Sequence, residues 1–309
     1  MKKQTGHTSF FRQMKRESKA DRAFHIFNIV YLSIAGIIVL YPLLYSLACS
    51  FSSTEAIIQG RVVLWPVEFT LDSYKAVLQY NMIGTGFLNS IVYCVGATIT
   101  SVILLLLAAY PLSRKDLPGK KGFTYFFVVT MFFNGGIIPN YMLMNQLNLV
   151  GSRWSLIIAF MFSCYNTVIV KSYFQTSIPQ GLLDAAHIDG CNDFLFFLRI
   201  AIPLAKPVIA VMVLFNMVSN WNGYFRALLY LTDPQTFTLQ QVLRSILFVA
   251  SMPSEIVSAM DDSSMQNLQN LYEQLRYAVL IVGMLPMMLV YPFVQKFFVK
   301  GMMIGSLKE

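Results

Sequence analysis

Charged residues are scarce in this chain of 309 residues, because Asp, Glu, Lys and Arg together make up only 12% of it. An ordinary soluble domain carries about 25% charged residues, whereas here 56% of the residues are hydrophobic. This balance argues against a soluble protein and indicates one that resides in a lipid bilayer. The net charge of +8 would also suit a nucleic-acid-binding protein, so the distribution of basic residues has to decide between the two.

Cysteine frameworks and phosphate-binding loops are absent as well. The four cysteines are scattered and form no CxxC motif, zinc-ligand spacing or disulfide framework. No G-x-x-x-x-G-K-[ST] loop occurs, and the nearest basic glycine stretch, at 118–122, has the wrong order and spacing. We therefore expect no metal, no cofactor and no ATP bound by that route, so any motor that energises the chain must be another chain.

Long apolar runs are what the sequence has instead. A bilayer core of about 30 Å requires roughly 20 mostly apolar residues per helix, and six such runs predict an all-α membrane protein with six transmembrane helices. The first run is too long for a signal-peptide core and precedes no small-residue cleavage site, so we count it as a span. The runs lie at about 24–49, 86–111, 123–145, 154–173, 207–231 and 277–295.

The basic residues predict the orientation, since Lys and Arg accumulate in cytoplasmic segments. With both termini inside, 17 of the 23 Lys and Arg residues fall on the cytoplasmic side. A multi-pass plasma-membrane protein thus explains the positive charge without nucleic acid. The expected parts are a basic cytoplasmic arm at 1–23, a six-span domain at 24–299 with a cytoplasmic loop at 177–206, and a cytoplasmic tail at 300–309. The long outer segments at 50–85 and 232–276 are either contacts for an extracellular partner or solvated amphipathic loops.

Ionisable side chains are almost missing from the runs themselves. His25, Lys171 and Arg226 lie near span ends, where long side chains can reach the membrane interface. Proton pathways and intramembrane proteases need acidic residues or His clusters at mid-depth. Ion-coupled transport and membrane catalysis are therefore both disfavoured.

The cytoplasmic loop between spans four and five predicts two short helices. Pro179 suits the first turn of one helix, and Gly190 suits a left-handed cap at its end. We expect Asp184 to lie early enough to face the positive end of that helix, and Asn192 to cap the second helix. The small pair Ala185-Ala186 gives the first helix a thin side for another protein, although an amphipathic connector lying on the bilayer fits the pattern equally well. The apolar residues of the second helix follow helical spacing: Phe194, Phe197, Leu198 and Ala201.

This loop resembles the cytoplasmic signature of the permease subunits of binding-protein-dependent ABC importers, in particular the sugar group typified by the maltose permease. That signature is Glu-Ala-Ala, three residues and then Gly, and here it reads Asp184 to Gly190, followed by Ile202 to Pro207 as in the sugar group. Asp184 is one methylene shorter than the usual Glu, and Cys191 replaces a common Ala. The resemblance extends over most of the chain, less well over the basic arm. The segments at 87–90, 109–114, 134–139 and 300–306 are similar to family members, the last two to a branch that imports complex or acidic oligosaccharides.

The resemblance implies a type I ABC importer permease fold that performs no bond chemistry and forms the pathway for a sugar or oligosaccharide. It implies as partners a second homologous permease subunit, two ATP-binding subunits and an extracellular solute-binding protein. The helix at 179–190 would be a coupling helix seated in a cleft of the ATPase, and the tail would reach toward the ATPases or be an ordinary chain end. The residues implied for ATPase docking are Asp184, Ala185, Ala186, His187, Asp189 and Gly190, and those for the tail contact are Lys300, Gly301, Gly305 and Ser306.

Polar and aromatic residues gather in span five, and amides beside a flat ring are the groups that bind sugars. Polar side chains also join membrane helices to one another, and Trp and Tyr favour the membrane interface. The candidates for the cargo path are Asn216, Ser219, Asn220, Trp221, Asn222 and Tyr224, with Asn134 in span three. In span three, Gly135-Gly136 with Pro139 predicts a break in the helix, which serves gating or, with more support, tight packing.

Two other functions compete with the importer permease. A membrane scaffold or regulator would have the docking helix but no transport, and ATP-dependent uptake into vesicles would distinguish the two. An ion-coupled carrier would lose uptake when the ion gradient collapses, and the scarcity of ionisable residues in the runs disfavours it.

Overall fold

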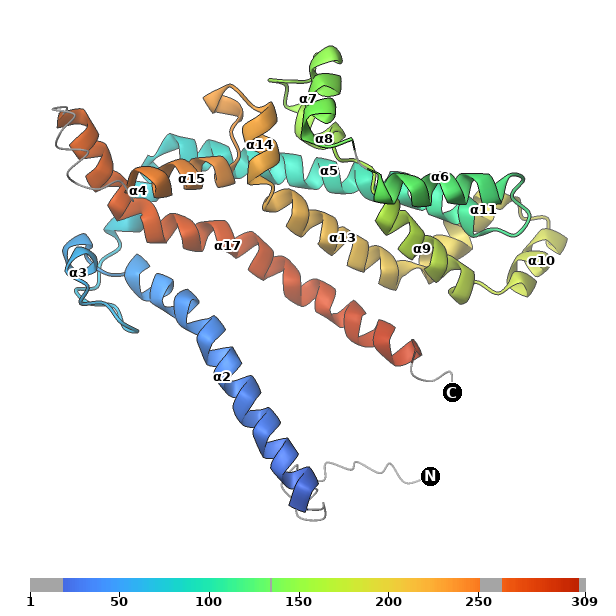
Figure 1. The fold of residues 1–309 in the computed structure, drawn as a ribbon, viewed down its shortest axis with the longest axis horizontal. Helices are drawn as coiled ribbons and strands as arrows, with labels where there is room; N and C mark the ends of the chain where they lie inside the picture. Colours follow the sequence, from blue (N-terminus) through green and yellow to red (C-terminus); the bar gives the residue numbers. More distant parts are fainter. Residues whose placement is uncertain (1–18, 134, 251–262, 306–309) are drawn as a thin grey trace. The chain divides into compact units, whose positions relative to one another are not determined.

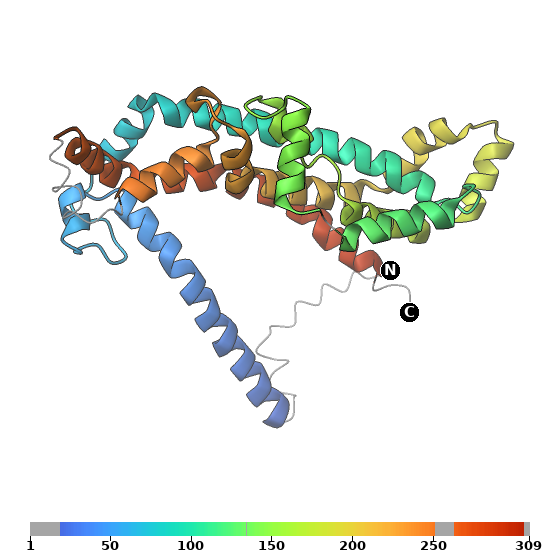
Figure 2. The same ribbon diagram turned by 45° about the horizontal axis from the view of Figure 1, so that its top comes forward.

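The computed structural model describes residues 19–133, 135–250 and 263–305, and in these ranges the secondary structure is entirely helical. The chain forms two units, residues 1–73 and 74–309, which are described in turn. Figures 1 and 2 show the helices from two directions.

The first unit contains the long apolar helix α2 (Lys19–Ser50) and the short helix α3 (Thr54–Ile58). Almost all side chains of α2 are exposed, as expected for a helix whose apolar surface faces lipid. The loop after α2 is held by hydrogen bonds, because the Ser52 hydroxyl donates to the Ala48 carbonyl and accepts from the Val67 N–H. Hydrogen bonds from Ser53 and Arg61 hold the pKa of Glu68 below its usual value.

The second unit begins with α4 (Asp72–Gln79) and is organised around α5 (Asn81–Ser113). Helix α5 has 33 residues and a strongly apolar sequence, and its buried face contacts α13, α9, α15 and α8. At 1.5 Å per residue it is longer than the bilayer core. It is therefore the helix against which the rest of this unit is positioned (Figure 1).

The segments between α5 and the loop at 177–206 are broken into short helices. Span three forms α6 (Lys120–Phe132) and α7 (Ile137–Gln146), with Phe133 and Gly136 as the flanking residues. Gly136 adopts a φ of 86°, which a side chain would disfavour. The break predicted at Gly135-Gly136 is thus confirmed. The region of span four forms α8 (Trp154–Ile158) and α9 (Cys164–Ser177).

The loop at 177–206 forms α10 (Gln180–Ile188) and α11 (Asp193–Phe196), and a π-helical turn, η1 (Phe197–Ala201), leads into α12 (Ile202–Leu204). Helix α13 (Lys206–Trp221) then runs beside α5, at an angle of 78° to the α11–α12 segment. Helix α14 (Tyr224–Tyr230), the 3-10 turn η2 (Pro234–Thr236), α15 (Leu239–Ala250) and α17 (Ser263–Gly305) complete the unit.

Two apolar clusters hold this unit together. One joins α5, α9 and α10–α13 through residues such as Leu105, Phe174 and Met212. The other joins α5, α13, α15 and α17 through Leu239 and Val279, both fully buried. Between membrane helices such clusters stabilise the fold through van der Waals packing, because lipid tails are as apolar as the side chains. The two clusters therefore fix how the helices pack.

Three of the six predicted spans, at 24–49, 86–111 and 277–295, fall within helices that are long and apolar enough to cross a membrane. The other three are not single helices. The run at 123–145 divides at the predicted glycine pair, whereas the runs at 154–173 and 207–231, which were predicted without a break, are corrected to divided segments. Span five, for example, is divided at Asn222-Gly223 into α13 and α14. Hydropathy measures the composition of a run and does not detect a cap or turn inside it.

Candidate coupling and cargo sites

Helix α10 is anchored by two buried side chains. Leu183 is 3% exposed and Ala186 is 7% exposed, and both pack in the cluster with Tyr110, Phe174 and Phe196. The ring of Tyr110 meets the ring of Phe174 edge-on at a centroid distance of 5.7 Å. Helix α10 therefore packs against the ends of α5 and α9 through this face, and its opposite face points away from them.

The two ends of the α10–α11 turn are built as the sequence predicted. Gly190 has a φ of 78°, the left-handed conformation typical of a residue just after a helix. The Cys191 N–H donates to the Ala186 carbonyl at 2.9 Å, which closes the end of α10. The side chain of Asn192 accepts the Leu195 N–H at 2.8 Å and caps α11. Both predicted caps are confirmed.

Three details of this loop differ from the expectation. Asp184 is the fifth residue of α10 and not in its first turn, so the helix dipole does not favour its charge as predicted. Ala185 is exposed while Ala186 is buried, so the two do not form one thin outer side. In the second helix, Phe196, Phe197 and Ala201 are buried, whereas Phe194 and Leu198 are exposed, because the π-helical turn shifts the register.

The outward face of α10 combines charge with apolar surface. Asp184, Ala185, His187, Asp189 and Gly190 are all exposed. Ile188 is 87% exposed and lies four residues after Asp184, on the same side of the helix. Asp184 accepts one hydrogen bond, from Gln180 at 3.3 Å.

A cluster of charges links the end of α5 to the α10–α11 turn. Arg114 donates two hydrogen bonds of 3.0 Å to Asp116 and lies 3.5 Å from Asp193, while His187 Nε2 lies 3.3 Å from the same Asp193 oxygen. The hydrogen bond from Arg114 holds the pKa of Asp116 below its usual value. The cluster thus ties the α10–α11 turn to the end of α5.

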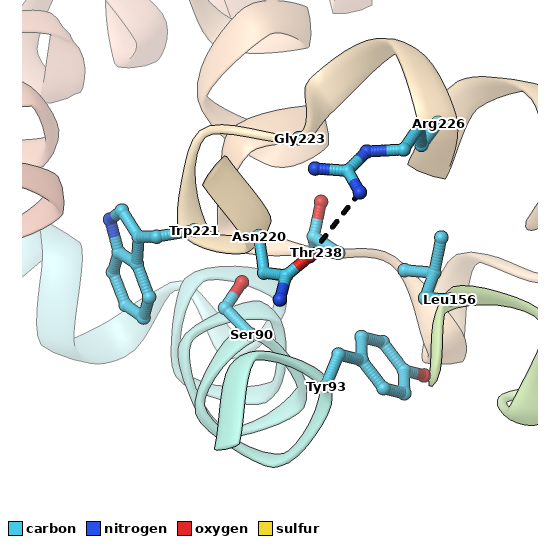
Figure 3. A pocket seen from close by; sticks show the side chains of 8 residues that line it. All are labelled: Ser90, Tyr93, Leu156, Asn220, Trp221, Gly223, Arg226 and Thr238. Atoms are coloured by element: carbon cyan, nitrogen blue, oxygen red, sulfur yellow. Dashed lines mark hydrogen bonds between the residues drawn. The ribbon is translucent and has the colours of Figure 1, made fainter. Parts of the chain in front are cut away.

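Figure 3 shows a small cavity where α13 breaks into α14 beside α5. The Arg226 guanidinium donates to Asn220 Oδ1 at 3.2 Å and to the Ser219 carbonyl at 2.6 Å, and it lies 5.0 Å from the centre of the Phe160 ring. Asn220 and Trp221 share this cavity with Ser90, Tyr93 and Thr238. Arg226 therefore satisfies the Ser219 carbonyl near the end of α13.

Two of the predicted cargo residues join helices. Trp221 is 4% exposed, and its indole N–H donates to the Gly283 carbonyl of α17 at 2.9 Å. Asn216 donates to the Met212 carbonyl and accepts the Ser101 hydroxyl of α5 at 2.9 Å. Their hydrogen-bonding groups face neighbouring helices, which fits the alternative that polar side chains hold membrane helices together.

The remaining predicted residues lie apart from this cavity. Asn222 is exposed at the break, and the ring of Tyr224 lies under the Arg244 guanidinium at 5.1 Å. Sequence reasoning did not single out Arg244, although its position four residues after Gln240 is a signal for a shared helix face. The backbone of Lys300, Gly301 and Gly305 continues α17. Asn134 and Ser306 lie outside the described residues.

The family profile described as "Binding-protein-dependent transport system inner membrane component" matches residues 8–304. This chain belongs to that family. It is 36% identical over 291 residues to protein LplC of Bacillus subtilis strain 168, covering 94% of this chain and 97% of LplC. It is 36% identical over 288 residues to the polygalacturonan/rhamnogalacturonan transport system permease protein YtcP of the same strain, covering 93% of this chain and 99% of YtcP.

A solved structure gives the same result for the fold. The chain is similar to a chain in the crystal structure of a bacterial ABC transporter involved in the import of the acidic polysaccharide alginate, with a TM-score of 0.82 and 34% identity over 91% of this chain and 99% of that chain. This binding-protein-dependent permease is therefore a membrane subunit of an ABC transporter and not an enzyme, because the ATPase of such systems is a separate subunit. The resemblance inferred from the loop at 184–190 is confirmed.

Proposed function

We propose that this permease forms, with a second homologous permease, the pathway through which an ABC importer takes up an acidic oligosaccharide. The names of the relatives support the cargo class. YtcP is a polygalacturonan/rhamnogalacturonan transport permease, and the transporter in the similar solved structure is involved in the import of alginate. Polygalacturonan, rhamnogalacturonan and alginate all carry carboxylates. Two ATP-binding subunits and an extracellular solute-binding protein would complete the importer.

The outward face of α10 is the observation that supports coupling to the ATPase. An exposed helix with Asp184, Ala185 and an 87% exposed Ile188 on its outer side leaves apolar surface without cover in this chain. Its inner side is fixed to α5 and α9 through Leu183 and Ala186. A force applied to α10 would thus pass directly to these two helices.

We further propose six crossings with both termini in the cytoplasm. The three long helices and the two bent helix pairs supply apolar length for five crossings, and we propose the segment of α8 and α9 as the sixth. The distribution of Lys and Arg supports the orientation, which places α10 on the side where ATP is hydrolysed.

The test is uptake into proteoliposomes that contain all subunits, the binding protein and an oligogalacturonide. We expect uptake that requires ATP and continues when proton and sodium gradients are dissipated. Asp184→Lys should reduce uptake at least about tenfold and reduce recovery of the ATPase in a detergent pull-down, because a charge reversal on the docking face costs several kcal/mol. Glu55→Lys, the same charge reversal on an exposed residue of α3, serves as the control for the pull-down and should leave recovery of the ATPase unchanged.

Two results would reject the proposal. Wild-type vesicles that take up no acidic oligosaccharide with ATP would remove the cargo assignment. Full uptake by Asp184→Lys, with normal ATPase recovery, would remove α10 as the coupling element.

A further inference from the structure

A groove between α14 and α15 has the chemistry of a site for an acidic sugar unit. Its cavity volume is about 380 Å³, within the range of small-molecule sites. Six side chains line it: Tyr224, Gln240, Leu243, Arg244, Leu247 and Phe248. One cation, one amide and an apolar wall therefore face the same hollow.

The two faces of α15 explain why these side chains point outward. Leu239, Val242 and Ile246 are at most 2% exposed and pack in the cluster with α5 and α17. Gln240 and Arg244 are four residues apart and thus lie on one face of the helix, away from that cluster. The position of the groove is fixed by a packed helix and not by a loop.

Arg244 is oriented by an aromatic ring and has no acidic partner within the described part of the chain. Its Cζ atom lies 5.1 Å from the centre of the Tyr224 ring, a cation–π contact that holds the guanidinium without neutralising it. The side chain is exposed. Its hydrogen-bond donors are therefore available to a ligand.

We propose that this groove binds a carboxylate-bearing sugar unit of the cargo, with Arg244 as the carboxylate ligand and Tyr224 as a positioning residue. The inference rests on the proposed function for the cargo class and for the outer location of the segment between spans five and six. A planar guanidinium binds a carboxylate through two parallel hydrogen bonds. The Gln240 amide can bond to ring hydroxyls, and Leu243 and Leu247 offer an apolar wall to the C–H face of the sugar.

The test measures direct binding to the purified complete importer in nanodiscs without the binding protein, by saturation-transfer NMR. The probes are an oligogalacturonide and its methyl ester, which differ in the carboxylate charge. Arg244→Gln should raise the Kd for the acid at least about tenfold, as expected for a lost charge-assisted pair, and should leave the Kd for the ester nearly unchanged. Tyr224→Ala should weaken acid binding several-fold, while Tyr224→Phe, which keeps the ring, should not.

Arg61→Gln provides a matched control, because Arg61 is an exposed arginine already paired with Glu68 at 2.8 Å. It removes the same charge and should not change either Kd. Equal losses for acid and ester in Arg244→Gln, or no loss at all, would overturn the proposal. So would dissociation of the purified complex in Arg244→Gln, since Arg244 would then pair with the partner permease. A failure of wild-type uptake would count against the proposed function, whereas these binding results decide the groove separately.

Discussion

Arg114, at the end of α5, contacts the α10–α11 turn through an ion pair with Asp193. Its side chain is 12% exposed and contacts two carboxylates, whereas the side chains of Asp116 and Asp193 are 62% and 67% exposed. If the arginine is removed, water can still solvate both carboxylates. The free energy of unfolding should therefore fall by the amount typical of a partly exposed ion pair, and not by the larger amount typical of an unpaired buried charge.

We predict that Arg114→Met lowers the free energy of unfolding of the detergent-solubilised permease by about 1 kcal/mol. Thermal unfolding should show a decrease in Tm of about 2 °C. Arg199→Met is the matched control, because Arg199 is an exposed arginine of the same loop, and its Tm should stay at the wild-type value.

The pH dependence of this difference follows from Asp116. The pKa of Asp116 is lowered in the folded state. Its contribution to the free energy of unfolding is therefore fully present above the ordinary aspartate pKa of about 3.9, and it is lost as the pH falls through the folded-state pKa. The Tm gap between wild type and Arg114→Met should therefore persist at neutral pH and shrink below about pH 4. A gap that is already absent at pH 7 would show that the pair contributes nothing.

At the scale of elements, α5 positions the segment that leads into α15. The Ser90 hydroxyl accepts the N–H of Leu239, the first residue of α15, at 2.8 Å. Asn89 donates to the carbonyls of Gln235 and Phe237. One face of α5 thus caps the helix that carries the groove.

Gly86 of α5 permits α15 to approach α5 closely near Leu239. A Cβ atom there would lie 3.2 Å from the Leu239 nitrogen and 3.2 Å from Val242 Cγ2, whereas one on Gly84 would meet nothing within 4 Å. We predict that Gly86→Val destabilises the permease by about 1–3 kcal/mol through overpacking. Gly84→Val shares any change in helix propensity, so the difference in Tm between the two variants isolates the contact. Equal Tm values would mean that α15 moves away without cost.

The elements differ in how well the sequence predicts them, for a physical reason. The bounds of α10 and α11 follow from local signals, a left-handed glycine at 190 and a capping side chain at 192, which act within a few residues. The pairing of Tyr224 with Arg244 joins two helices across 20 positions, and no local pattern contains it. The same holds for Trp221, whose indole N–H donates to the Gly283 carbonyl of α17, a residue 62 positions along the chain.

At the scale of the whole chain, the hydropathy pattern predicts where apolar length lies but not whether it forms one helix. The 33 residues of α5 are continuous, whereas the run at 207–231 divides at Asn222-Gly223 although both runs are apolar. Divided helices leave terminal carbonyls that need partners. At this division Arg226 supplies one, with its bond to the Ser219 carbonyl.

The orientation of the chain can be tested with two arginines on opposite predicted sides. In a background with the four cysteines replaced by alanine, Arg199→Cys and Arg61→Cys place single thiols at exposed positions. A membrane-impermeant maleimide should label Arg61→Cys in right-side-out vesicles and Arg199→Cys in inside-out vesicles, because translocation disfavours the basic residues of the loop at 177–206. The reverse pattern would put α10 outside the cell, where no ATPase could reach it, and labelling of both thiols from one side would require an even number of crossings between them.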